Sequence, residues 1–171
     1  MPYPAKAVAN EFLELAKKDG QQLTQMQLQK LVYFAYGWYL AITGTRLIDE
    51  RVEAWQWGPV IPSIYKEFKR FGSSSVTEPA REVTFRDGKV GFFPARIQSD
   101  DPKADGLALQ VIKRVWDIYG KYSASALSNM THAPNSPWSK TSDREIRGTD
   151  IEDTLIVQYF RELASKHEQR A

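Results

Sequence analysis

The chain has no cysteine among its 171 residues. Disulfide bonds, catalysis by a thiolate and zinc sites built on sulfur are therefore excluded. An excess of charge of one sign is also missing, because 23 basic and 21 acidic residues leave a net charge of +2. A protein that binds nucleic acid through its phosphates carries a marked basic patch, so we expect no nucleic-acid partner.

Patterns for phosphate, metal and membrane binding are missing as well. Neither G-x-x-x-x-G-K nor G-x-G-x-x-G occurs, so a nucleotide site has no support. The two histidines, His132 and His167, lack the spacing of metal ligands, and we expect no metal and no cofactor. The apolar run Leu31–Ile42 is shorter than the roughly 20 residues that cross a bilayer. The first residues, MPYPAKAVANEF, do not resemble a signal peptide. We therefore expect a cytoplasmic protein without a membrane partner.

The stretch from Thr24 to Gly44 predicts the central helix of the fold. Thr24 and Gln27 have the spacing of a capping box, and Gly44 suits the position just after a helix. One apolar face follows helical spacing and consists of Leu28, Leu31, Val32, Ala35, Trp38, Tyr39 and Ile42. The other faces hold Tyr33, Phe34, Tyr36 and Leu40. A helix that is apolar all round is a buried one, and Gly37 in its middle indicates a neighbour packed close to the backbone.

The rest of the chain predicts further helices and one small β-hairpin. Turn and cap signals place helices after Pro4, over roughly 61–71, 105–119 and 123–130, and over about 150–168. The last of these is expected to begin with a capping box at Thr149, and its apolar stripe is expected to consist of Ile151, Leu155, Tyr159 and Leu163. Asp87-Gly88 is a favoured type I′ turn, and it sets Phe85 opposite Val90 and Val83 opposite Phe92. We predict a mainly α (α+β) fold, with residues 1–171 forming a single compact helical domain.

An aromatic segment follows the central helix. Arg51–Trp57 alternates as an extended run does, which would place Trp55 and Trp57 on one face, and Gly58-Pro59 breaks that run. The two tryptophans have two interpretations, as core anchors or as an aromatic contact surface of the hot-spot type. The acidic residues Asp49, Glu50 and Glu53 cluster after the central helix, and acidic residues clustered in a loop are usually solvated.

Several of these segments together resemble the Panacea domain, the family of SocA-like antitoxins and phage-associated (GepA) proteins. The resemblance depends on LQKLVYFAYGWYLAITG, EAWQWGPVIPSIYKEF and LSNMTHAPNSPW in this order, and it covers about residues 5–140. It implies an antitoxin that neutralises a cognate toxin protein by direct binding. One branch of the family implies a different mechanism, in which the antitoxin is an adaptor that delivers the toxin to a AAA+ protease.

A catalytic alternative centres on His132. Ser128, Thr131 and Asp143 lie near it in sequence, so a hydrolase with a nucleophile, a base and an acid can be imagined. The other interpretation is a histidine whose ring hydrogen-bonds to backbone and holds the turn that leads to Trp138. We favour the second interpretation and expect no enzyme, because nothing in the sequence fixes the geometry that a triad needs.

The expected partner-binding residues are the aromatic and apolar side chains around the Gly-Pro junction and the segment that could fold back onto it. They are Trp55, Trp57, Pro59, Val60, Tyr65, His132 and Trp138.

Overall fold

The computed structural model describes residues 1–141 and 148–170. Its helices are α1 (Ala5–Lys18), α2 (Gln25–Thr43), α3 (Pro62–Phe68), the 3-10 helix η1 (Lys69–Phe71), α4 (Pro102–Tyr119), α5 (Ala124–Thr131), α6 (Pro137–Thr141) and α7 (Asp153–Arg170). Its strands are β1 (Glu53–Trp55), β2 (Gly58–Val60), β3 (Arg81–Arg86), β4 (Lys89–Pro94) and β5 (Thr149–Asp150). The fold is mainly α with a small β component, as the sequence predicts. Within the described ranges, each helix is too short or too polar to cross a membrane.

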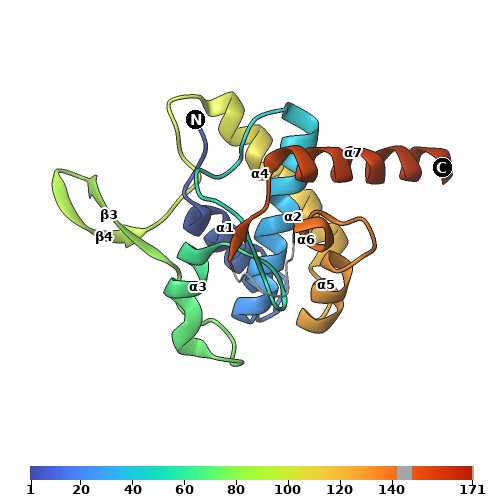
Figure 1. Ribbon diagram of the computed structural model, residues 1–171. Helices are drawn as coiled ribbons and strands as arrows, with labels where there is room; N and C mark the ends of the chain where they lie inside the picture. Colours follow the sequence, from blue (N-terminus) through green and yellow to red (C-terminus); the bar gives the residue numbers. More distant parts are fainter. Residues whose placement is uncertain (142–147, 171) are drawn as a thin grey trace.

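The helix α2 is the centre of the fold, as predicted. It contacts α1, α4, α5 and α7, and Figure 1 shows it passing through the middle of the molecule. Its capping box is present, with the Thr24 amide donating to Gln27 Oε1 at 2.9 Å and the Gln27 amide donating to Thr24 Oγ1 at 3.3 Å. Gly44 ends the helix in the left-handed conformation, with φ 71°. Ile42 is an exception to the predicted apolar face, since it lies near the end of the helix and is 63% exposed.

Gly37 lies where α7 crosses α2. A Cβ atom at this position would lie 2.2 Å from the Phe160 ring, which is closer than any packing contact. The side of α7 that faces α2 is therefore set by Phe160 and Ile156, both fully buried. The predicted stripe is right in part, since Tyr159 and Leu163 pack against the core. It omitted Phe160 and Ile156, because the two sets are adjacent on the helix and both are apolar. The predicted capping box at Thr149 was also wrong, since that residue belongs to β5.

The β structure exceeds the single hairpin that the sequence predicts. The predicted hairpin is present, with Phe85 opposite Val90 and Val83 opposite Phe92. A second antiparallel pair, β1 with β2, is extended by β5 into a three-stranded sheet in the order β2-β1-β5. Pro59 is accommodated there because β2 is an edge strand, where a missing amide proton costs no ladder hydrogen bond.

Glu50 substitutes for an N-cap at the start of α1. Pro4 offers no side-chain cap, and the Ala5 amide instead donates to both carboxylate oxygens of Glu50, at 2.9 and 3.1 Å. Ser63 Oγ donates to the same carboxylate at 3.0 Å. The expectation of a solvated acid is thus wrong for Glu50. Burial, followed by a hydrogen bond with Asp49, raises the pKa of Glu50 to about 7.

This raised pKa predicts a pH dependence of stability. In the unfolded chain the pKa of Glu50 is the ordinary 4.5 of a glutamate, whereas in the folded protein the side chain keeps its proton up to about pH 7. The contribution of Glu50 to the free energy of unfolding is therefore largest below pH 4.5 and falls as pH rises towards 7. Urea unfolding of Glu50→Gln should show a shallower decline over this range than the wild type, and identical curves would contradict the assignment.

Candidate functional site

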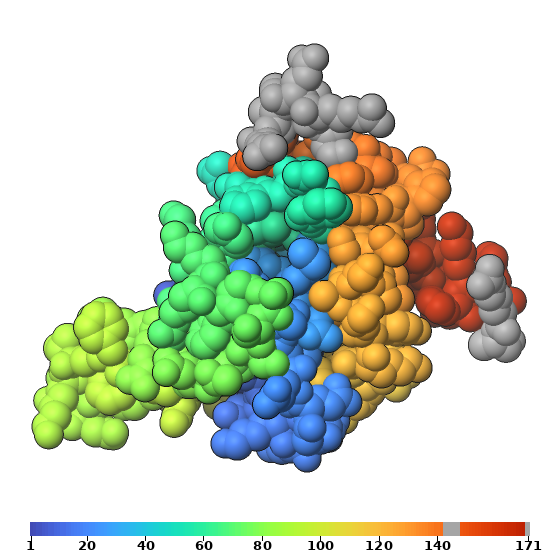
Figure 2. Space-filling view, turned by 90° about the horizontal axis from the view of Figure 1, so that it is seen from below, coloured from blue at the N-terminus to red at the C-terminus, as the bar shows by residue number. Residues whose placement is uncertain are grey.

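The aromatic segment and the start of α2 enclose one large groove. Its volume is about 860 Å³. The side chains that we use to define this aromatic groove are Met26, Lys30, Trp55, Trp57, Val60 and Tyr65. Seen from below in Figure 2, the blue residues of α2 lie between the green α3 segment and the orange α5 segment. A concave, largely apolar surface with a few polar groups is typical of a binding site.

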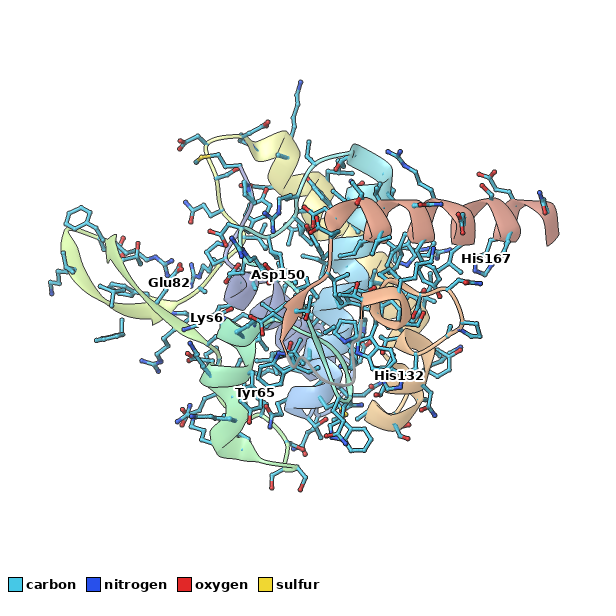
Figure 3. All side chains as sticks on the ribbon, viewed as in Figure 1. Lys6, Tyr65, Glu82, His132, Asp150 and His167 are labelled. Carbon is cyan, nitrogen blue, oxygen red and sulfur yellow. The ribbon has the colours of Figure 1, made fainter. Side chains whose placement is uncertain are left out.

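Two aromatic residues form one wall of the groove. The Trp55 and Tyr65 rings pack edge to face, with their centroids 4.9 Å apart, and Trp55 Nε1 donates to Glu53 Oε2 at 2.8 Å. Tyr65 remains 38% exposed, and Figure 3 shows it on α3. Trp57 lies outside the strand, in the turn between β1 and β2, and is 61% exposed. We predicted that Trp55 and Trp57 lie on one face of a single extended strand. This prediction was wrong, because the chain reverses direction at the turn that contains Trp57.

The floor of the groove is held by two polar side chains of α2. Gln29 Oε1 accepts from the Ile61 amide at 2.9 Å, and Gln29 Nε2 donates to the Ile61 carbonyl at 3.1 Å. Lys30 Nζ donates to the Pro59 carbonyl at 3.0 Å. Two consecutive side chains of α2 thus bind the backbone of β2 and of the residue after it. This explains why Gln29 and Lys30 occur together among the buried residues of α2, which are otherwise mostly apolar.

Lys30 is the most unusual residue of the site, because it is only 1% exposed. Among the described residues it has no carboxylate within ion-pair distance. Burial lowers the pKa of its amine to about 7. Sequence reasoning missed Lys30, since lysine is almost never fully buried without a partner. The signal that could have found it is its polar character inside an apolar helix.

His132 and Trp138 lie beside the groove rather than in it. Their rings pack against each other with centroids 3.9 Å apart and an angle of 33° between the ring planes, and Trp138 Nε1 donates to the Trp55 carbonyl at 2.7 Å. Within the described residues His132 Nε2 is buried without a hydrogen-bond partner. Within residues 1–141 and 148–170 the ring forms no hydrogen bond to backbone, so our prediction of such a bond is wrong for the described part of the chain. The ring packs against Trp138 instead. Burial and, to a lesser degree, the charge of Lys30 lower the pKa of His132.

The hydroxyl groups that could act with His132 are engaged elsewhere. Ser128 Oγ donates to the Trp57 carbonyl at 2.8 Å, and Thr131 Oγ1 donates to the Ser128 carbonyl at 2.6 Å. The third member of the imagined triad, Asp143, lies outside the described residues. In the described part of the chain, no group of three or more metal-ligating side chains is present.

The structure thus gathers four of the seven predicted partner-binding residues in one groove, namely Trp55, Trp57, Val60 and Tyr65. Pro59 is buried beneath them, and its carbonyl accepts a hydrogen bond from Lys30. His132 and Trp138 contribute indirectly, because their packed rings support the backbone at Trp55.

Comparison with known proteins agrees with the resemblance noted in the sequence. The family described as "Antitoxin SocA-like, Panacea domain" matches residues 28–139, a range that begins within α2 and includes five of the six side chains that define the groove, all except Met26. One relative is the protein named Antitoxin SocA from Caulobacter vibrioides (strain NA1000 / CB15N). It is 34% identical over 135 residues, which are 78% of this chain and 68% of that protein. No solved structure matches the chain. The family match and the extent of this similarity show that the chain belongs to the SocA-like, Panacea-domain antitoxin family.

Proposed function

We propose that this protein is an antitoxin that neutralises a cognate toxin protein by binding it directly, and that the aromatic groove is the contact surface. The antitoxin role is supported by family membership and by the name of the Caulobacter relative. One observation supports the aromatic groove as the contact surface. The exposed side chains of Trp57 and Tyr65 lie in a largely apolar groove of about 860 Å³. Tryptophan and tyrosine are the residues in which binding energy concentrates at protein interfaces.

The aromatic side chains of the groove are held in place before any partner binds. The Tyr65 ring is already ordered by Trp55, and Trp55 is held by Glu53 and through its carbonyl by Trp138. An ordered side chain loses little conformational entropy when a partner binds, and this favours affinity. The proposed occupant is a segment of the toxin with apolar side chains, since the groove offers few polar groups.

Neutralisation in a purified system tests this mechanism. The toxin encoded by the gene next to this one should be inhibited by a stoichiometric amount of this protein without any protease. Protection that requires a AAA+ protease in cells, with no inhibition in the purified system, would favour an adaptor instead. A hydrolase using His132 would be favoured if His132→Ala abolished protection while folding and toxin binding stayed intact.

Truncation of the groove aromatics gives a quantitative prediction. Trp57→Ala or Tyr65→Ala should weaken toxin binding by about 2 kcal/mol, or roughly thirtyfold in Kd. Thermal stability should stay close to that of the wild type, because both side chains are partly exposed. Ile118→Ala on α4 is a matched control, since Ile118 is 40% exposed and Tyr65 is 38% exposed. Calorimetric titration and thermal melts measure both quantities, and groove variants that bind as the wild type does would place the interface elsewhere.

A further inference from the structure

The β3–β4 hairpin exposes an apolar face. Val83, Phe85, Val90 and Phe92 are neighbours in the hairpin register and lie on the same side of the two strands. They are 62%, 70%, 74% and 71% exposed, respectively. We call these four side chains the hairpin patch. A contiguous apolar patch of this kind on a protein surface marks an interaction site.

The opposite face of the hairpin has its own packing. The Arg86 guanidinium lies over the Phe93 ring, 5.2 Å from its centroid. The Phe93 ring in turn lies close to Gly91, where a Cβ atom would approach it to 3.2 Å. Apart from Lys89 beside the turn, the residues of this face are less exposed than those of the hairpin patch. The hairpin is therefore amphipathic, and it is the apolar side that faces solvent.

The base of the hairpin is fixed to α1. The buried side chain of Asn10 donates to the Ala80 carbonyl at 2.8 Å and to the Ala95 carbonyl at 2.9 Å, and it accepts from the Ala80 amide at 2.7 Å. Lys6 Nζ adds a contact to the Arg81 carbonyl at 3.3 Å. Figure 1 shows the hairpin projecting from the helices. The patch is thus displayed on a firmly anchored element that stands clear of the aromatic groove.

We propose that the hairpin patch joins two copies of this chain in a two-fold symmetric dimer. The two cross-strand pairs are Val83 with Phe92 and Phe85 with Val90, so each phenylalanine has a valine both beside it and opposite it. A two-fold axis that runs across the strands at the level of Thr84 brings Phe85 of one copy onto Val83 of the other. It also brings Phe92 onto Val90. Large side chains therefore meet small ones at every position of the patch, which is the condition for close packing.

The charges at the ends of the hairpin agree with the same axis. Arg81 begins β3, and Asp87 follows the last residue of that strand, in the turn, so the axis brings the Arg81 end of one hairpin to the Asp87 end of the other. In the described part of the structure neither residue forms an ion pair within its own chain. Opposite charges at matching positions fix the register of an interface. The net charge of +2 gives little general repulsion between copies.

The size of the patch predicts a weak dimer. Two valines and two phenylalanines at these exposures present on the order of 500 Å² per copy. Two copies would bury roughly 1,000 Å², which is close to the lower limit for a specific interface. We therefore expect dissociation in the micromolar range and a monomer–dimer equilibrium that depends on concentration.

Analytical ultracentrifugation of the full chain tests the proposal. The mass should rise with concentration from the monomer value of 19.6 kDa towards twice that value. Phe85→Thr/Phe92→Thr should remain monomeric with an unchanged melting temperature, because threonine suits a strand and both phenylalanines are exposed. Arg81→Glu should weaken the dimer severalfold by placing two acids together. Ile42→Thr, on a side chain that is 63% exposed outside the patch, should leave the dimer intact.

A wild-type protein that stays monomeric up to several hundred micromolar would overturn the proposal, as would a dimer that survives the double substitution. If the wild type is monomeric and the double variant loses toxin binding, the patch contacts the toxin and not a second copy. The test of the dimer is independent of the test of the proposed function. Trp57→Ala should weaken toxin binding and leave the dimer intact.

Discussion

Gly37→Ala should destabilise the protein by about 2–3 kcal/mol, although alanine is the better helix former by about 1 kcal/mol. The added Cβ would lie 2.2 Å from Phe160 Cε2 and 2.4 Å from Cζ. The Phe160 ring is fully buried and packs edge to face against Tyr33 and Trp38. These contacts restrict the movement of the ring, so we expect α7 to shift away from α2. Urea unfolding measures the change in the free energy of unfolding.

Gly106→Ala is the matched control for this substitution. Gly106 also lies inside a helix, α4, but a Cβ atom there would have no neighbour within 4 Å. The same change should therefore stabilise the protein by about 0.5–1 kcal/mol. Phe160→Leu should recover part of the stability lost in Gly37→Ala, because it removes the overlapping ring atoms. Two glycine variants that shift stability in the same direction would contradict the close approach of α7 to α2.

Stability should rise by about 2 kcal/mol between pH 7 and pH 9 because of Lys30. The pKa of the Lys30 amine is 10.5 in the unfolded chain, and burial lowers this pKa to about 7 in the folded protein. The unfolded state thus binds more protons throughout this window, and raising the pH favours the folded state. Below pH 7 the amine is protonated in both the folded and the unfolded state. The full free-energy cost of burying the charged amine then lowers the stability of the folded protein.

Lys30→Met tests this interpretation directly. Methionine keeps an unbranched apolar stem and removes the charge, at the loss of one hydrogen bond to the Pro59 carbonyl. The rise between pH 7 and pH 9 should disappear, and at pH 7 the variant should be at least as stable as the wild type. Urea unfolding at several pH values measures both effects. A variant with an unchanged pH profile would show that Lys30 is not the group responsible.

The sequence predicted the parts of the fold that local chemistry determines. Thr24 with Gln27 fixed the start of α2, and Asp87-Gly88 fixed the hairpin register. In both cases the signal is a short-range hydrogen-bond or backbone requirement. The motifs around Trp55 and Tyr65 also led to the residues that line the groove, because large aromatic groups beside a Gly-Pro pair need a fixed environment.

The features that the sequence did not predict depend on contacts between distant segments. The β1–β2 pair has Gln56-Trp57 at its turn, which lacks the usual turn residues. Whether Phe160 or Tyr159 faces α2 depends on the approach of two helices at Gly37. Alternation in the hairpin showed which side chains share a face, but only the tertiary structure shows that this face is exposed. The burial of Lys30 has the same origin, since β2 covers it from a distant position in the chain.

Photo-crosslinking from single positions tests the proposed toxin interface most directly. A photoreactive phenylalanine analogue can replace Trp57 or Tyr65 in the groove, with Ile118 on α4 as an exposed control position. The purified variants are irradiated with the toxin in the absence of protease. We predict adducts to the toxin from both groove positions and none from Ile118. Adducts from Ile118 alone, or none from either groove position in a complex that still forms, would contradict the assignment of the groove as the toxin-binding surface.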